Sequence, residues 1–195
     1  MKDRNVARKR LLNLVEGALM VAFAVVLDLI PFPSWPQGGS ISIAAIPLIY
    51  YSYRAGVAWG VGAGFVYSGV QMLTGFYVPP ANTVLAILLC VLLDYVLAFG
   101  VFGLADVFAR LFGKHRLVGY GVGALIVSLL RYVCSALSGI ILWGSYAPEG
   151  MNVIWYSVSY NGSYMIPNAI LATVLTVLLC MALDPRTGKP MKKNA

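Results

Sequence analysis

The sequence predicts an all-α integral membrane protein with six transmembrane helices in a single domain, residues 1–195. Hydrophobic residues make up 60% of the chain and charged residues 11%, whereas soluble domains have about 45–50% and about 25%. The hydrophobic residues form long runs, close to the roughly 20 residues that a helix needs to cross a bilayer core. The sequence has no strict two-residue alternation, which excludes a closed barrel.

Each hydrophobic run must be helical, because lipid offers no hydrogen-bond partner to backbone N–H and C=O groups. The runs predict helices at about 11–30, 41–53, 55–76, 83–105, 117–143 and 163–183. The first is too long for the apolar part of a signal peptide and lacks a cleavage site, so we interpret it as a permanent helix. The second is short and contains Pro47, so it needs tilt, a kink or protein neighbours to reach across.

The positive charges predict the orientation of these helices. Thirteen of the fourteen Lys and Arg residues fall on one side of the membrane if six helices alternate, and segments 31–40, 77–82 and 144–162 on the other side contain none. The positive-inside rule therefore places both termini in the cytoplasm of a multi-pass protein of the cell (plasma) membrane. The thirteen are Lys2, Arg4, Arg8, Lys9, Arg10, Arg54, Arg110, Lys114, Arg116, Arg186, Lys189, Lys192 and Lys193.

Arg131, in the fifth predicted helix, and Asp94, in the fourth, are charged residues at membrane depth. Inserting such a charge costs about 2.5–3.5 kcal/mol, so the side chain faces the protein interior and often marks a functional site. Either the two residues neutralise each other as a structural pair, or they take part in binding. The two interpretations do not exclude each other.

Two polar stripes run inward from the side without Lys or Arg. Residues three, four or seven positions apart share one face of a helix, so each stripe faces protein or water. It either forms hydrogen bonds between helices or lines an outward-facing cavity, where Trp35, Tyr156 and Asp94 would suit a flat cationic ligand. The stripes are Arg131, Ser135, Gly139 and Trp143, and then Asn161, Tyr164 and Asn168.

Small residues recur at four-residue spacing on three predicted helices, which allows helices to approach closely. Internal packing is the first interpretation of this spacing, and a docking face for another membrane subunit is the alternative. The residues are Gly56, Gly60 and Gly64, then Gly119 and Gly123, then Ala18 and Ala22.

Several function classes find no support in the sequence. It has no phosphate-binding loop, no nucleophile elbow and no His or Glu spacing for a metal, and its basic residues lie in membrane loops and not on a nucleic-acid-binding surface. Cys90, Cys134 and Cys180 sit singly inside apolar runs, as small buried residues do. We therefore expect no enzyme activity, no metal, no cofactor and no nucleic-acid partner.

Short motifs spread over nearly the whole chain are specific when taken together. They are Pro36-Gln-Gly-Gly-Ser40, Leu93-Asp94-Tyr95, Ala98-Phe99, Arg131-Tyr132, Ser138-Gly139, Trp143-Gly-Ser-Tyr-Ala-Pro148, Tyr156-Ser157 and Tyr160-Asn161. With these motifs the chain resembles the thiamine-specific substrate-binding subunits (ThiT or YuaJ-type S-components) of energy-coupling factor (ECF) transporters. The resemblance implies a six-helix S-component fold with an outward-facing thiamine site.

The resemblance also implies which residues hold the ligand. The matching positions are Trp35, Asp94, Tyr95, Trp143, Tyr156 and Asn161. Ser135 stands where the family has a His on helix five, and Arg131 is one candidate to replace the lost hydrogen bond. The acid is Asp94, where some members have Glu. A thiamine precursor or analogue, or another small vitamin, is therefore the alternative ligand.

The partners implied by the resemblance are a transmembrane coupling subunit and two cytoplasmic ATPase subunits. Ala18 and Ala22 match the face with which family members dock to the coupling subunit. The implied cycle is binding outside, toppling of the whole subunit in the membrane lipid, and release inside, while partners hydrolyse ATP. A membrane enzyme that acts on a lipid and a structural or assembly protein are the alternatives from other classes.

Overall fold

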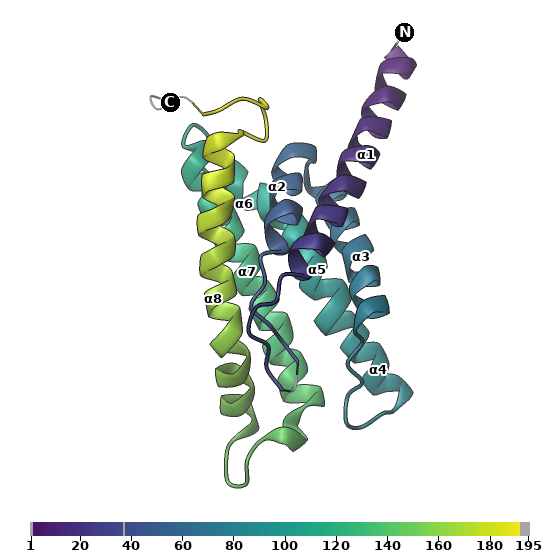
Figure 1. Cartoon of the computed structure of the whole chain (residues 1–195), viewed down its shortest axis with the longest axis vertical. Coiled ribbons are helices and arrows are strands. Elements are labelled where there is room, and N and C mark those ends of the chain that lie inside the picture. Colours follow the sequence, from purple (N-terminus) through teal and green to yellow (C-terminus); the bar gives the residue numbers. More distant parts are fainter. Residues whose placement is uncertain (1, 37, 192–195) are drawn as a thin grey trace.

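The computed structural model describes residues 2–36 and 38–191, which form a helical bundle (Figure 1). Within these residues the regular structure is helical, apart from one isolated β-bridge between Ser34 and Ser40, so the all-α prediction is confirmed. Gln37, Lys192 and Lys193, which entered the sequence-based predictions, lie outside the described residues. The elements are α1 (Lys2–Asp28), α2 (Ala45–Ala55), α3 (Val57–Thr74), α4 (Val84–Cys90), the π-helix η1 (Val91–Leu97), α5 (Ala98–Gly100), the 3₁₀-helix η2 (Val101–Leu104), α6 (Ala105–Arg110), α7 (Arg116–Leu142), the 3₁₀-helix η3 (Gly144–Tyr146) and α8 (Val153–Ala182).

Four helical stretches in the described part of the chain are long and apolar enough to cross a membrane: Arg4–Asp28, Val84–Arg110, Arg116–Leu142 and Val153–Ala182. The second stretch runs without interruption from α4 through η1, α5 and η2 to α6. The other two predicted spans correspond to α2 and α3, which have 11 and 18 residues. The chain is thus a membrane protein, and its six-span count stays a prediction.

The last helix begins at Val153 and not near residue 163, so the prediction of an outer loop over 144–162 is wrong for its second half. Asn152 caps the helix, because its side-chain oxygen accepts a hydrogen bond from the Ile154 N–H at 2.8 Å. The first turns carry polar and aromatic residues that face a cavity. Hydropathy, which detects lipid-facing residues, therefore does not detect them.

Smaller corrections apply to the first four helices. The basic segment before residue 11 is helical, and α6 ends at Arg110 and not at 105. Helix α2 begins at Ala45, which places Pro47 in the first turn, where a missing N–H breaks no helical hydrogen bond. Gly56, with φ of 93°, separates α2 from α3, so it is a turn residue and not part of a helical stripe.

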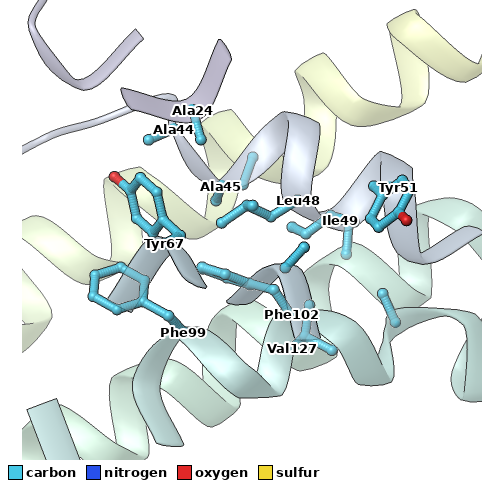
Figure 2. Packing of buried hydrophobic residues seen from close by; sticks show 14 of the residues in the cluster. Ala24, Ala44, Ala45, Leu48, Ile49, Tyr51, Tyr67, Phe99, Phe102 and Val127 are labelled. Carbon is cyan, nitrogen blue, oxygen red and sulfur yellow. The ribbon is translucent and has the colours of Figure 1, made fainter. Parts of the chain in front are cut away.

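Helix α2 lies at the centre of the core. Its residues from Ala45 to Tyr53 are all buried. Figure 2 shows Leu48 and Ile49 in one cluster with Phe102 of η2 and Val127 of α7. Because protein surrounds this short helix, its ends need not meet lipid, which accounts for its length.

The glycine stripes serve internal packing. A Cβ atom added at Gly60 would lie 2.8 Å from Ser52 Cβ and 2.9 Å from Gly103 Cα. One added at Gly119 would lie 3.2 Å from the Cα of Ala109. Helices α3 and α7 therefore approach η2 and α6 more closely than larger residues would permit.

We predict that Gly60→Ala lowers the stability of the protein by about 1–3 kcal/mol, because the new methyl group forces the backbones of α3 and η2 apart. Gly62→Ala on the same helix is the matched control, since a Cβ there meets nothing within 4 Å. It should be neutral or slightly stabilising, as alanine favours helix. Thermal unfolding in detergent measures both, and equal melting temperatures for the two variants would contradict the packing described here.

Candidate functional site

A cavity of about 210 Å³ lies among the loop after α1, α3, η1, α7 and α8. On α7 the lining residues lie in the second half of the helix, and on α8 they lie in the first half. The cavity is therefore in the half of the bundle away from both chain termini (Figure 1). Seven of the eight residues predicted to bind the ligand line it together. They are Asp94, Tyr95, Arg131, Ser135, Trp143, Tyr156 and Asn161.

Asp94 is placed by the π-helical stretch η1, in which it is the central residue. π-Helical turns widen the helix locally and occur often at functional sites. The Ser138 hydroxyl donates a hydrogen bond to Asp94 Oδ2 at 2.5 Å, and the Cys90 thiol donates to the same oxygen at 3.5 Å. Two neighbours on α7 and α4 therefore hold the carboxylate at the cavity wall.

Arg131 also lines the cavity, but it does not form an ion pair with Asp94. The four ion pairs among the described residues include neither side chain. The Arg131 guanidinium lies over the rings of Phe99 and Phe102, at 4.7 and 5.6 Å from their centroids. Its Nε is buried without a hydrogen-bond partner in the described part of the chain. The two side chains therefore do not contact each other directly, and both line the cavity.

The polar stripe predicted on helix five faces the cavity along its whole length, from Arg131 through Ser135 and Gly139 to Trp143. Ser135 is buried, and its side chain donates no hydrogen bond to another described residue. At Gly139 an added Cβ would lie 3.0 Å from Asn161 Nδ2. This glycine therefore lets α8 pack closely against the floor of the site.

Aromatic rings form two groups around the cavity. Trp143 and Tyr146 are stacked, with centroids 6.0 Å apart and an interplanar angle of 18°. On α8, Tyr156 contacts Tyr160 at 5.7 Å, and Tyr160 contacts Tyr164 edge-on at 6.2 Å. These five side chains all line the cavity, which therefore offers flat aromatic faces together with the carboxylate of Asp94.

Trp35 is the one predicted binding residue outside the cavity lining. Its ring lies 5.5 Å from Tyr164, which does line the cavity. Its backbone closes a tight turn, since Trp35 N–H donates to Gly39 O at 2.9 Å and Gly38 N–H donates to Trp35 O at 3.1 Å. Gly39 has φ of 90° and packs against Tyr164, so a side chain there would be strained. Trp35 thus packs against a residue of the cavity lining, Tyr164, without lining the cavity itself.

Tyr95 and Asn161 line the cavity, but their polar groups form hydrogen bonds with other residues of the protein. The Tyr95 hydroxyl donates to Gly75 O at 3.2 Å and accepts from Tyr77 N–H at 3.1 Å, which fixes the loop after α3. The Asn161 amide donates to Ser157 O at 3.0 Å and accepts the Tyr164 hydroxyl at 2.5 Å. Both residues therefore shape the site through their neighbours.

The sequence-based predictions missed a polar cluster of Asp28, Ser42, Tyr67 and Gln71 on another part of the cavity lining. Asp28 accepts a hydrogen bond from Ser42 Oγ at 2.6 Å and another from Gln71 Nε2 at 2.5 Å, and Gln71 also bonds the Tyr67 hydroxyl. Asn168, the last residue of the predicted stripe on α8, does not line the cavity; it donates to Ser40 O and accepts from Ser42 N–H, both at 2.8 Å. The sequence contained one signal for this cluster: Asp28 and Gln71 are polar residues inside otherwise apolar runs.

Ala18 and Ala22 are exposed on α1 and do not line the cavity. Helix α1 is also the least enclosed of the four candidate spans, with 11% of it buried against 28–33% in the others. Among the described residues, no group of three or more His, Cys, Asp or Glu side chains is arranged to hold a metal ion.

Comparisons with known proteins agree with this arrangement. A family model described as thiamine transporter protein (Thia_YuaJ) matches residues 14–187. The chain is 39% identical to the thiamine transporter ThiT of Bacillus subtilis (strain 168), covering 94% of this chain and 97% of that one, and 29% identical to ThiT of Lacticaseibacillus paracasei, covering 88% and 86%.

Among solved structures, ThiT from Listeria monocytogenes matches with a TM-score of 0.72 and 25% identity, covering 88% of this chain and 94% of that one. Sequence, fold and the length of the matched region thus agree with one another and confirm the resemblance found in the sequence motifs. This chain belongs to the thiamine transporter protein family Thia_YuaJ.

Proposed function

We propose that this protein is the substrate-binding (S) subunit of an ECF-type ABC importer and captures extracellular thiamine for transport across the membrane. The observation that supports this most directly is the cavity at Asp94, where a carboxylate meets the rings of Trp143 and Tyr156. Family membership and the names of the relatives support thiamine as the ligand. In this proposal the protein is not an enzyme, and partner subunits hydrolyse ATP.

The chemistry of thiamine suits such a cavity. Thiamine has a positively charged thiazolium ring and a flat aminopyrimidine ring with hydrogen-bond donors and acceptors. A cation over an aromatic face gains about 0.5–2 kcal/mol, and the Asp94 carboxylate complements the positive charge. Ser135 and Arg131 supply hydrogen-bonding groups for the second ring. Trp35, Tyr95 and Asn161 act mainly as positioning residues.

The proposed orientation has all six helical segments spanning the cell membrane and both termini in the cytoplasm. The distribution of Lys and Arg along the chain supports it, because the loops at the cavity end carry none of these residues. The cavity then opens to the outside, from which a nutrient arrives.

The proposed partners are a transmembrane coupling subunit and two cytoplasmic ATPase subunits. Helix α1 is suited to docking, since Ala18 and Ala22 are exposed and form one turn of small side chains between the larger Leu14 and Val26. Close helix approach in lipid depends on such small residues.

A thiamine precursor or analogue is the second candidate ligand. Ser135 is shorter than the family His at this position, and it leaves space and one fewer ring donor at the cavity floor. Titration of the purified protein with thiamine, its precursors and its analogues separates the two candidates by their affinities.

We predict that Asp94→Asn weakens thiamine binding by at least about tenfold, because a buried carboxylate that faces a cation contributes about 2–5 kcal/mol when its partner is present. Tryptophan fluorescence of the purified protein, titrated with thiamine, measures the affinity. A neutral analogue without the charged ring should bind both proteins alike. Glu149→Gln is the matched control, since Glu149 is exposed at the same end of the bundle and outside the cavity lining. Unchanged thiamine affinity in Asp94→Asn would reject the proposed role of this residue.

We predict that Ala18→Leu combined with Ala22→Leu abolishes thiamine uptake by cells that hold the ECF coupling and ATPase subunits, because the added bulk blocks helix docking. Thiamine binding to the purified variant should stay unchanged, since neither residue lines the cavity. Leu19→Trp combined with Phe23→Trp is the control, because these exposed residues lie about 100° around α1. Uptake lost equally in both double variants, or retained in both, would contradict docking through the alanine face.

A further inference from the structure

A second pocket, of about 400 Å³, opens at the opposite end of the bundle, between α1, the junction of α2 and α3, α6 and the segment after α8. Figure 1 shows that this end also holds both chain termini. The pocket shares no lining residue with the cavity at Asp94. Four cationic side chains from four different elements line it: Lys9, Arg54, Arg110 and Arg186.

Carboxylates neutralise only part of this charge. Asp106, the acid in the lining, is 1% exposed; Arg110 Nε donates to it at 2.7 Å, and Arg186 Nη2 lies 3.5 Å away. Glu16, beside the pocket, pairs with Arg54 at 2.7 Å. Four cations against these two acids leave two positive charges in surplus at the pocket.

The donors at the pocket also outnumber the acceptors. Each guanidinium carries five N–H groups in a planar fork, and Arg110 and Arg186 share the single carboxylate of Asp106. Helix α3 begins at this pocket, with Gly56 as its N-cap and no side chain capping its first turn. The free N–H groups of a helix N-terminus add partial positive charge and bind anions readily.

We propose that this pocket binds a phosphate group, carried either by an anionic lipid headgroup or by free inorganic phosphate. Two surplus charges match the one to two negative charges of such a group, and arginine forks match its geometry. Basic pockets between helices on the cytoplasmic side of membrane proteins recognise anionic headgroups in this way. A phosphate here ties α1, α2, α6 and the C-terminal segment together, and so stabilises the bundle at the end away from the cavity.

The test uses the full chain in phosphatidylcholine nanodiscs and measures its melting temperature. One arm adds millimolar sodium phosphate against sodium chloride of equal ionic strength, and the other replaces part of the lipid with phosphatidylglycerol. We expect at least one arm to raise the melting temperature by about 2–4 °C. A response to phosphate in pure phosphatidylcholine identifies a free-phosphate site, and a response to phosphatidylglycerol alone identifies a headgroup site.

The decisive variant is Lys9→Gln combined with Arg186→Gln, which should lose most of that rise. Arg8→Gln combined with Lys189→Gln is the matched control, because it removes the same charge from adjacent exposed residues that do not line the pocket. Thiamine titration of both variants checks that they are folded and keeps this result independent of the proposed transport function. No rise in either arm for the unmodified protein, or the same rise in both double variants, overturns the proposal.

Discussion

Asp94 carries a carboxylate into a part of the bundle built mainly from apolar and aromatic side chains. Burying a charge without compensation is costly, so the surrounding elements are arranged around this residue. The π-helical stretch η1 turns it toward α7, where Ser138 donates to it, and Cys90 on α4 donates from one helical turn earlier. These neutral donors satisfy one carboxylate oxygen and leave its charge to a cationic ligand. Asp94 therefore both joins three helical elements and provides the charge for the proposed ligand.

The loop after α1 is held by the same kind of compensation. The Ser40 C=O and the Ser42 N–H would be unsatisfied next to the cavity if the Asn168 side chain did not bond both, and the Ser42 hydroxyl donates to Asp28. These two partners come from the first and last helices. The cavity wall therefore depends on the closure of the whole bundle, and it cannot form from α7 and α8 alone.

Hydropathy and charge were enough to predict the all-helical class and the long apolar helices such as α1 and α7, because each of these is one long apolar run in the sequence. The same signal failed for the first turns of α8, where Tyr156 and Asn161 face the cavity and lower the hydropathy. Motif resemblance located most of the cavity lining. It could not give the π-helical turn at Asp94, or the hydrogen bond between Asp28 and Gln71, which lie 43 positions apart in the sequence.

The separation of Arg131 from Asp94 bears directly on how the cavity discriminates between ligands. Had the two formed an ion pair, a cationic ligand would have to break it, and most of its electrostatic gain would be lost. The rings of Phe99 and Phe102 instead hold the guanidinium through cation–π contacts, which need no carboxylate. The cavity lining thus contains the Asp94 carboxylate and the Arg131 guanidinium as separate groups, together with the Asp28 carboxylate, which Ser42 and Gln71 already hydrogen-bond. A ligand with its positive charge on one ring and hydrogen-bond acceptors on the other suits this arrangement, because Asp94 complements the charge and Arg131 can donate to the acceptors.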